Sequence, residues 1–149
     1  DMISAGLEIS LKFNYDDFSL FTGHTVSDNR YISGDNSETV AYNPKHKSYF
    51  VLMYELEHFI RLGLEAYYTG RQYDYGGRLM RDYWIFGFMA ERHFEYVSVF
   101  INFENFTDTR QSRFGVPVEV PSSASDPGYI NIFAPLDGFI ANAGVKLRF

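Results

Sequence analysis

Two groups of arginine and tyrosine residues stand in long polar segments and are the best candidates for ligand binding. A guanidinium group binds anions through paired hydrogen bonds, and an aromatic ring stacks on planar solutes or on cations. Together these residue types suit anionic or planar ligands, although exposed loops also carry them without any ligand. The candidates are Tyr73, Tyr75, Arg78 and Arg81 in the first group, and Arg110, Arg113 and Tyr129 in the second.

Residues that could support catalysis do not form a recognisable constellation. Glu55 and Glu57 fall on one face of a strand pattern and could pair as acid and base, but charge at a strand end explains them more simply. The chain has no cysteine and no Gly-x-Ser-x-Gly motif, and its histidines lack the spacing of metal ligands. We therefore predict no enzyme activity, no metal and no cofactor. The histidines are His24, His46, His58 and His93, the last two at expected tight turns.

The elements that must position these residues are β-strands, as the carboxyl-terminal end of the chain indicates most clearly. Residues 137–149 alternate between apolar and polar side chains, apart from Ile140 on the polar side. A strand shows this pattern when one face meets an apolar medium and the other meets water. The apolar side consists of Phe139, Ala141, Ala143, Val145, Leu147 and Phe149.

The same alternation recurs through the chain, and its repetition carries more weight than any single strand. β-Branched and aromatic residues dominate these runs, and no stretch holds apolar residues at helical spacing for three turns. The sequence therefore predicts an all-β protein, an antiparallel up-and-down meander of about seven long strands. The predicted strands are residues 3–15, 18–23, 46–57, 60–69, 83–91, 97–104 and 137–149.

Alternation alone does not say whether the apolar face points into or out of a barrel. A soluble barrel of the lipocalin kind turns this face inward, whereas a transmembrane barrel turns it toward lipid. Connection lengths favour the membrane version, because short turns at one rim and long loops at the other are typical of transmembrane barrels. Short turns are predicted at residues 14–17, 57–59 and 92–95, and long segments at residues 26–44, 72–81 and 107–136.

Two further patterns favour a transmembrane barrel. Aromatic residues gather near predicted strand ends, where rings lie at the level of lipid headgroups. The face opposite the apolar one carries too many charges for a dry core, which suits a water-filled or plugged lumen. Five of these charges are expected to form ion pairs with one another or with a plug: Glu8, Glu65, Glu104, Arg61 and Arg148. The aromatic residues are Tyr15, Phe18, Tyr68, Trp84, Phe94 and Tyr96, and the charged ones are Glu8, Lys12, Glu55, Arg61, Glu65, Glu104, Lys146 and Arg148.

Composition excludes several classes of protein. The formal net charge is −6 and no basic stripe occurs, so nucleic acid is not an expected partner. No run approaches the roughly 18 apolar residues of a membrane-spanning helix, which argues against a helical membrane protein. The absence of cysteine excludes disulfides and thiolate metal sites.

Three segments give the chain a resemblance to a known family. Residues 100–115 resemble the end of the penultimate barrel strand in TonB-dependent outer-membrane receptors, where an Asn-Leu-x-Asp-x-x-Tyr type of motif occurs. Asn105, Phe106 and Asp108 match its first positions, and Gln111 departs from the usual aromatic residue. Residues 67–72 are similar to a Tyr-Thr-Gly-Arg-Gln pattern of an earlier strand end, and residues 134–139 with the final strand are similar to receptors of the Bacteroides group.

The resemblance implies a 22-stranded barrel in which residues 1–149 form a single segment with the last seven strands. The plug domain, the motif that contacts TonB and the first fifteen strands would lie upstream. Such receptors bind a scarce solute, a ferric siderophore or similar, and import it across the bacterial outer membrane with energy transmitted through TonB. The final strand also resembles the signal by which the barrel assembly machinery recognises its substrates. The implied partners are outer-membrane lipid, the missing barrel and plug, TonB, that machinery and, as a further candidate, a surface lipoprotein.

Other interpretations stay open from the sequence alone. Asp1 leads straight into a strand, and seven is an odd count where bacterial single-chain barrels close with an even number, so we expect a segment of a longer protein. An eighth strand in residues 115–120 or 129–134 would instead complete a small outer-membrane barrel, an adhesin or structural protein. A soluble ligand-binding barrel is the third interpretation. The sequence does not name the solute.

Overall fold

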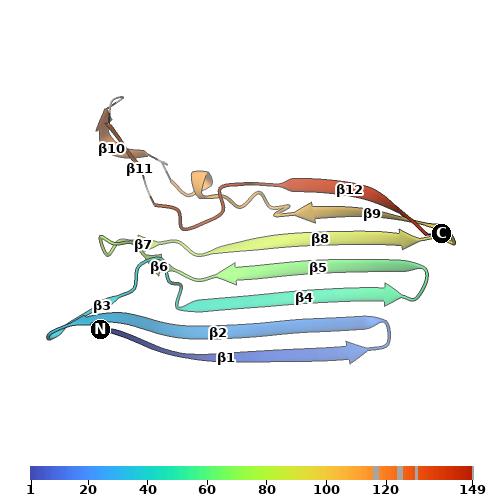
Figure 1. Ribbon diagram of the computed structural model, residues 1–149, viewed down its shortest axis with the longest axis horizontal. Helices are drawn as coiled ribbons and strands as arrows, with labels where there is room; N and C mark the ends of the chain where they lie inside the picture. The colour runs from blue at the N-terminus through green and yellow to red at the C-terminus, as the bar shows by residue number, and fades with distance from the viewer. Residues whose placement is uncertain (116–117, 124–125, 130, 149) are drawn as a thin grey trace.

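The predicted all-β antiparallel meander is confirmed. The computed structural model describes residues 1–115, 118–123, 126–129 and 131–148, with side chains for residues 1–115 and 131–148. Long strands run up and down in chain order and form one sheet (Figure 1). In spatial order they are β1 (Met2–Tyr15), β2 (Phe18–Ser33), β4 (His46–Leu56), β5 (Ile60–Thr69), β8 (Tyr83–His93), β9 (Val97–Glu104) and β12 (Ile140–Leu147).

Short elements occupy the connections between the long strands. Strand β3 (Asn36–Thr39) folds back on the end of β2 and is the eighth member of the main sheet. Strands β6 (Gln72–Tyr73) and β7 (Leu79–Met80) form a small hairpin, and β9 is followed by a 3-10 turn, η1 (Gln111–Arg113). Strands β10 (Val118–Ser123) and β11 (Asp126–Tyr129) pair with each other as a separate two-stranded sheet.

The eighth strand considered at residues 115–120 or 129–134 does not form in the main sheet. Where the structure describes these stretches, their strand residues belong to β10 and β11, which pair only with each other. Residues 116, 117 and 130 lie outside the described part of the chain. The strand that does join the sheet, β3, was not predicted, because its four residues are polar and show no alternation that a sequence pattern could detect.

Short and long connections lie at opposite ends of the sheet, as predicted (Figure 1). We call the end with turns 16–17, 57–59 and 94–96 the short-turn rim, and the other end, with connections 34–45, 70–82 and 105–139, the long-loop rim. The positive φ angles of Asp16 (47°) and His58 (59°) close the first two turns. The predicted ends of β2 and β8 were wrong: β2 continues to Ser33 instead of ending at residue 23, and β8 continues to His93 instead of ending at residue 91.

The strand register places the predicted apolar side chains within the seven long strands on one face, which we call the apolar face. Residues directly opposite in an antiparallel pair share a face, so the ladder can be followed from edge to edge. One continuous row crosses all seven long strands. That row is Phe13, Leu20, Leu52, Leu64, Phe88, Phe103 and Ala141.

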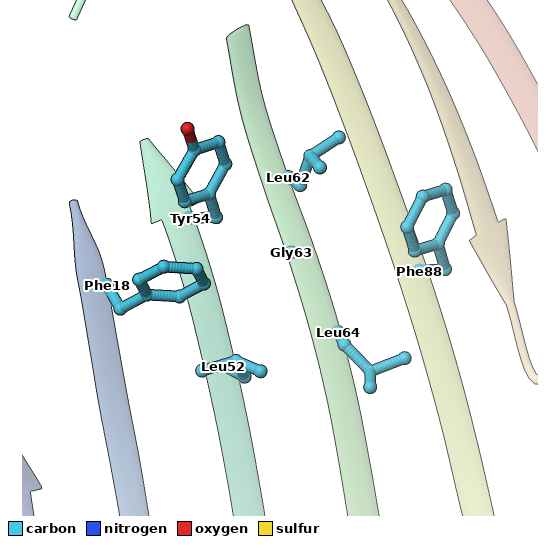
Figure 2. A pocket seen from close by; sticks show the side chains of 7 residues that line it. All are labelled: Phe18, Leu52, Tyr54, Leu62, Gly63, Leu64 and Phe88. Atoms are coloured by element: carbon cyan, nitrogen blue, oxygen red, sulfur yellow. The ribbon is translucent and has the colours of Figure 1, made fainter. Parts of the chain in front are cut away.

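No layer formed by the described residues covers the apolar face. Figure 2 shows apolar side chains from β2, β4, β5 and β8 standing together on it, around a shallow hollow of about 300 Å³. Among residues with described side chains, only two hydrophobic ones, Met80 and Ala134, are buried. Both lie at the long-loop rim rather than in the sheet. The sheet therefore has no hydrophobic core of its own.

The opposite face, which we call the polar face, combines charges with aromatic rings that lie over glycines. Tyr49 stands directly opposite Gly23, and its ring occupies the space that a β-carbon of Gly23 would need. Phe100 covers Gly144 in the same way. A large ring can lie flat on this face because the facing residue has no side chain.

Candidate ligand-binding site

Two hairpins meet at the long-loop rim and are joined by the segment that follows β3. The main-chain N–H of Tyr42 donates to the carbonyl of Tyr73 in β6 at 2.7 Å. The Tyr42 ring also packs edge-on against the Tyr75 ring, with centroids 5.4 Å apart. This contact fixes the β2–β3 hairpin beside the β6–β7 hairpin.

A pocket of about 490 Å³ lies between these hairpins. Its tyrosines, Tyr31, Tyr73 and Tyr75, remain 53%, 43% and 81% exposed. Tyr31 pairs with Glu38 across β2 and β3 in the register of the polar face. The remaining lining residues are Glu38, Thr39, Ala41, Asp74, Gly76 and Gly77.

The two carboxylates of the pocket differ in their surroundings. Asp74 accepts hydrogen bonds from the main-chain N–H groups of Gly76 (2.9 Å) and Arg78 (2.8 Å) and from the Arg78 guanidinium at Nε (3.1 Å). It therefore closes the β6–β7 turn, where Gly77 has φ +74°. Glu38 is exposed, and the ion pairs among described residues do not include it.

Of the first predicted group of ligand residues, the two tyrosines line the pocket and the two arginines do not. Tyr73 and Tyr75 line the pocket together. Arg78 is occupied by Asp74, and Arg81 lies over the ring of Phe114, 4.7 Å from its centroid. The two tyrosines therefore share a site without a free arginine beside them.

The second predicted group has a local structural role. Arg110 and Arg113 both bind the carboxylate of Asp108, the former at 3.2 Å. Two cations that share one acidic partner close together are held in place by it, and their charge is partly neutralised. Tyr129 is the last residue of β11, and its side chain lies outside the described part of the structure.

The motif residues Asn105 and Asp108 build the turn that follows β9. Both have positive φ angles, 47° and 54°, which Asn and Asp tolerate better than most residues. The Asn105 amide donates to the carbonyls of Thr109 (2.7 Å) and Asp137 (3.2 Å) and accepts from the Thr109 N–H (2.9 Å). Asp108 accepts the N–H of Phe139 at 3.3 Å. The motif thereby ties the end of β9 to the approach to β12.

The same tie explains why β12 begins later than predicted. Gly138 packs so closely against Asp108 that a β-carbon at Gly138 would collide with its carboxylate. Residues 137–139 are thus held by the turn instead of the ladder, and the strand starts at Ile140. Ala141, Ala143, Val145 and Leu147 of the predicted assembly signal share the apolar face through their pairing with β9. Phe139 packs 5.8 Å from Phe103, and Phe149 lies outside the described residues.

Gln111, which departs from the family motif, is a structural centre that sequence reasoning missed. It is only 6% exposed, and its Oε1 accepts the N–H groups of Phe133 (2.8 Å) and Ala134 (3.2 Å) while its Nε2 donates to Asn131. Gln72, also buried, donates to the Phe133 carbonyl at 3.1 Å. The two glutamines hold residues 131–135 across the long-loop rim. No spacing pattern in the sequence predicts the contact between Gln72 and Phe133, which are 61 positions apart.

The polar face holds a chain of ion pairs near the short-turn rim. Arg61 pairs with Glu55 at 2.5 Å and approaches Glu91 at 3.9 Å, and Glu91 pairs with Lys146 at 2.8 Å. The predicted ion pairing on this face is thus found for Arg61, but with partners other than those we expected. The other expected members, Glu8, Glu65, Glu104 and Arg148, make no ion pair among the described residues.

The candidates for catalysis remain apart. Glu55 belongs to the ion-pair chain, whereas Glu57 lies in the turn beyond β4 beside His58. His93 ends β8 instead of lying in a turn and contacts Ser98 Oγ at 2.9 Å, and His24 lies 3.4 Å from His46. In the described part of the chain, no three His, Asp or Glu side chains are arranged to hold a metal ion.

Aromatic rings gather at both ends of the apolar face, near the strand ends as predicted. Toward the long-loop rim, Trp84 lies 5.0 Å from Tyr68 and 5.8 Å from Phe86. Toward the short-turn rim, Phe18 lies 4.8 Å from Tyr54. Tyr15 flanks turn 16–17, and Phe94 and Tyr96 form part of turn 94–96. Helices long and apolar enough to cross a membrane do not occur among the described residues.

The fold defines the chain as an all-β, antiparallel up-and-down sheet with one apolar and one polar face. No family model matches the sequence, and a comparison with curated proteins finds no match.

Proposed function

We propose that the chain is the carboxyl-terminal barrel segment of a TonB-dependent outer-membrane receptor that binds and imports a scarce solute. The observation that carries this proposal is the continuous apolar face, which crosses every long strand and which the described part of the chain leaves uncovered. A sheet in water covers such a face with a second layer. Lipid can cover the apolar face without a second layer of protein.

Strand length supports a membrane as the medium. Strands β4, β5 and β8 contain 11, 10 and 11 residues, and a tilted transmembrane β-strand needs about 9–11. Trp84 and Phe94 belong to opposite aromatic groups and are ten positions apart. At about 3.4 Å per residue and a tilt of about 40°, they are separated by about 26 Å along the membrane normal, close to the roughly 25 Å apolar band of outer-membrane barrels.

The large accessible surface of the chain supports the proposal that another component covers much of it. The accessible surface is 10522 Å², whereas a compact monomer of this size would expose about 7,800 Å². The sheet also ends in two strands, β1 and β12, which pair on one side only among the described residues. Unpaired strand edges are unfavourable in lipid, because each unsatisfied backbone group costs several kcal/mol there.

Strand direction supports additional strands rather than direct closure. β1 and β12 are the first and seventh strands of an alternating series and run in the same direction (Figure 1). Closing them on each other would create a parallel pair in an antiparallel barrel. Antiparallel closure needs an odd number of further strands, and the fifteen upstream strands implied by the family resemblance meet this condition.

The resemblance of the Asn105 motif and the carboxyl-terminal strand supports a receptor rather than another kind of barrel. In this proposal the outer-membrane lipid covers the apolar face, the polar face lines a 22-stranded barrel, and the upstream plug contacts TonB. The long-loop rim lies outside the cell and receives the solute. The barrel assembly machinery would insert the protein, and a surface lipoprotein is a candidate partner at the mouth.

The proposal is tested by the size and location of the mature protein in the native cell. An antibody raised against residues 131–148 is applied to fractionated membranes, and we expect an outer-membrane species several times heavier than this chain. An outer-membrane species of the chain's own size would replace the receptor with a small barrel. A species in the soluble fraction would overturn the assignment of both faces.

A further inference from the structure

The pocket between the two hairpins has the wrong charge for the anionic solutes that the sequence suggested. That expectation depended on four arginines, and each has a partner at the long-loop rim. Arg78 is paired with Asp74, and Arg110 and Arg113 share Asp108. Arg81 lies on Phe114. None of the nine residues that line the pocket is a lysine, arginine or histidine.

What remains in the pocket is one acidic group among aromatic rings. Asp74 is already satisfied by two N–H groups and a guanidinium. Glu38 has no ionic partner among the described residues and is exposed. Three phenol rings, from Tyr31, Tyr73 and Tyr75, line the same hollow. The negative face of an aromatic ring attracts cations, and a carboxylate adds a full opposite charge.

We propose that this pocket binds an organic cation, a solute with an amino or quaternary ammonium group. The head group would lie among the three tyrosines and close to Glu38. Tyr42 fixes the shape of the pocket, because its main-chain hydrogen bond to Tyr73 and its ring contact with Tyr75 hold the two hairpins together. The assignment deepens the proposed receptor function and rests on it, since it takes the long-loop rim as the mouth that meets the solute.

Choline and its neutral isostere 3,3-dimethyl-1-butanol test the proposal directly, because they differ in charge and hardly in shape. Binding is measured by titration calorimetry on the full-length protein in detergent micelles. We expect choline to bind at least tenfold more tightly than the isostere. Glu38→Gln should weaken choline binding about tenfold, and Tyr75→Ala should weaken it several-fold.

Asp35→Asn is the matched control, because Asp35 lies in the turn of the same hairpin but does not line the pocket. Its choline affinity should equal that of the unmodified protein. Equal binding of choline and the isostere would overturn the proposal, as would an unchanged affinity in Glu38→Gln or no binding of choline to the folded protein. Membrane fractionation tests the receptor function independently, so the failure of one proposal does not mimic the failure of the other.

Discussion

Asn105 and Asp108 show what two motif residues do in physical terms. Each adopts a positive φ angle, and their side chains bond main-chain groups on both sides of a long connection. Ordinary residues adopt this backbone conformation at a cost and could not make these bonds. The pair therefore acts as a clamp between β9 and β12.

Replacement of Asn105 by alanine should destabilise the protein by about 2–4 kcal/mol. The change removes three hydrogen bonds, leaves the Thr109 N–H without its acceptor and puts alanine at a positive φ angle that asparagine tolerates better. Urea unfolding of the full-length protein in detergent would measure this loss. Asn142→Ala is the control, because Asn142 is exposed and its one side-chain bond is 3.5 Å long, and it should cost less than about 0.5 kcal/mol. Equal effects of the two changes would contradict the clamp.

Gln111→Leu should release residues 131–135 from the long-loop rim. The leucine cannot accept the N–H groups of Phe133 and Ala134, and a buried polar group without a partner costs about 1–3 kcal/mol. Chymotrypsin should then cleave after Phe133 at least tenfold faster in the native protein. Ser112→Ala, an exposed change in the same 3-10 turn, should leave the rate unchanged. An unaltered rate in Gln111→Leu would show that other contacts hold the segment.

At the scale of strands, periodicity predicted faces well and boundaries less well. Seven alternating runs were enough to assign the central row of apolar side chains to one face, because the strand period of two is a local property of the backbone. The continuation of β2 to Ser33 and the strand β3 were missed, since they depend on a polar hairpin. The late start of β12 depends on Asp108, which is distant in sequence. Contacts between distant residues also form the pocket, and of its lining residues Tyr73 and Tyr75 were predicted, whereas Tyr31 and Glu38 were not.

The face assignment predicts opposite outcomes for neighbouring positions in β5. Leu64 lies in the central row of the apolar face. If lipid covers this face, as we propose, an arginine at mid-membrane costs about 2–4 kcal/mol. Glu65 lies on the polar face and accepts a hydrogen bond from the Tyr67 hydroxyl. Leu64→Arg should reduce the amount of folded protein in outer membranes far more than Glu65→Arg does. Similar amounts of the two variants would refute the assignment.

The ion-pair chain should couple strands that are not neighbours. Glu91 in β8 and Lys146 in β12 are 2.8 Å apart although β9 lies between them. The Glu91 side chain is 5% exposed but Lys146 is 58% exposed, so solvent screens the pair and we expect a coupling of only about 1 kcal/mol. A double-mutant cycle with Glu91→Gln and Lys146→Met in urea unfolding measures it. The exposed pair of Asp28 and Arg30 should give a smaller coupling energy. Equal coupling energies for the two pairs would show that the Glu91–Lys146 pair contributes no more than an ordinary surface ion pair.

At the scale of the whole molecule, a sheet with two open edges should not form a pore by itself. The isolated 149-residue chain, added to lipid vesicles, should release no more entrapped dye than buffer does, because β1 and β12 cannot close antiparallel on each other. A bacterial porin serves as the positive control. Dye release by the isolated chain would favour the small complete barrel over the receptor segment.

The missing hydrophobic core also determines when this chain can fold. Only Met80 and Ala134 bury apolar side chains within the described residues, so collapse in water offers little driving force for forming the sheet. If lipid covers the apolar face, that driving force appears only when the strands enter the bilayer. Folding and membrane insertion are then one kinetic event, with no stable folded intermediate in water. The chain would reach the membrane unfolded, and its folding rate would depend on the amount of lipid available.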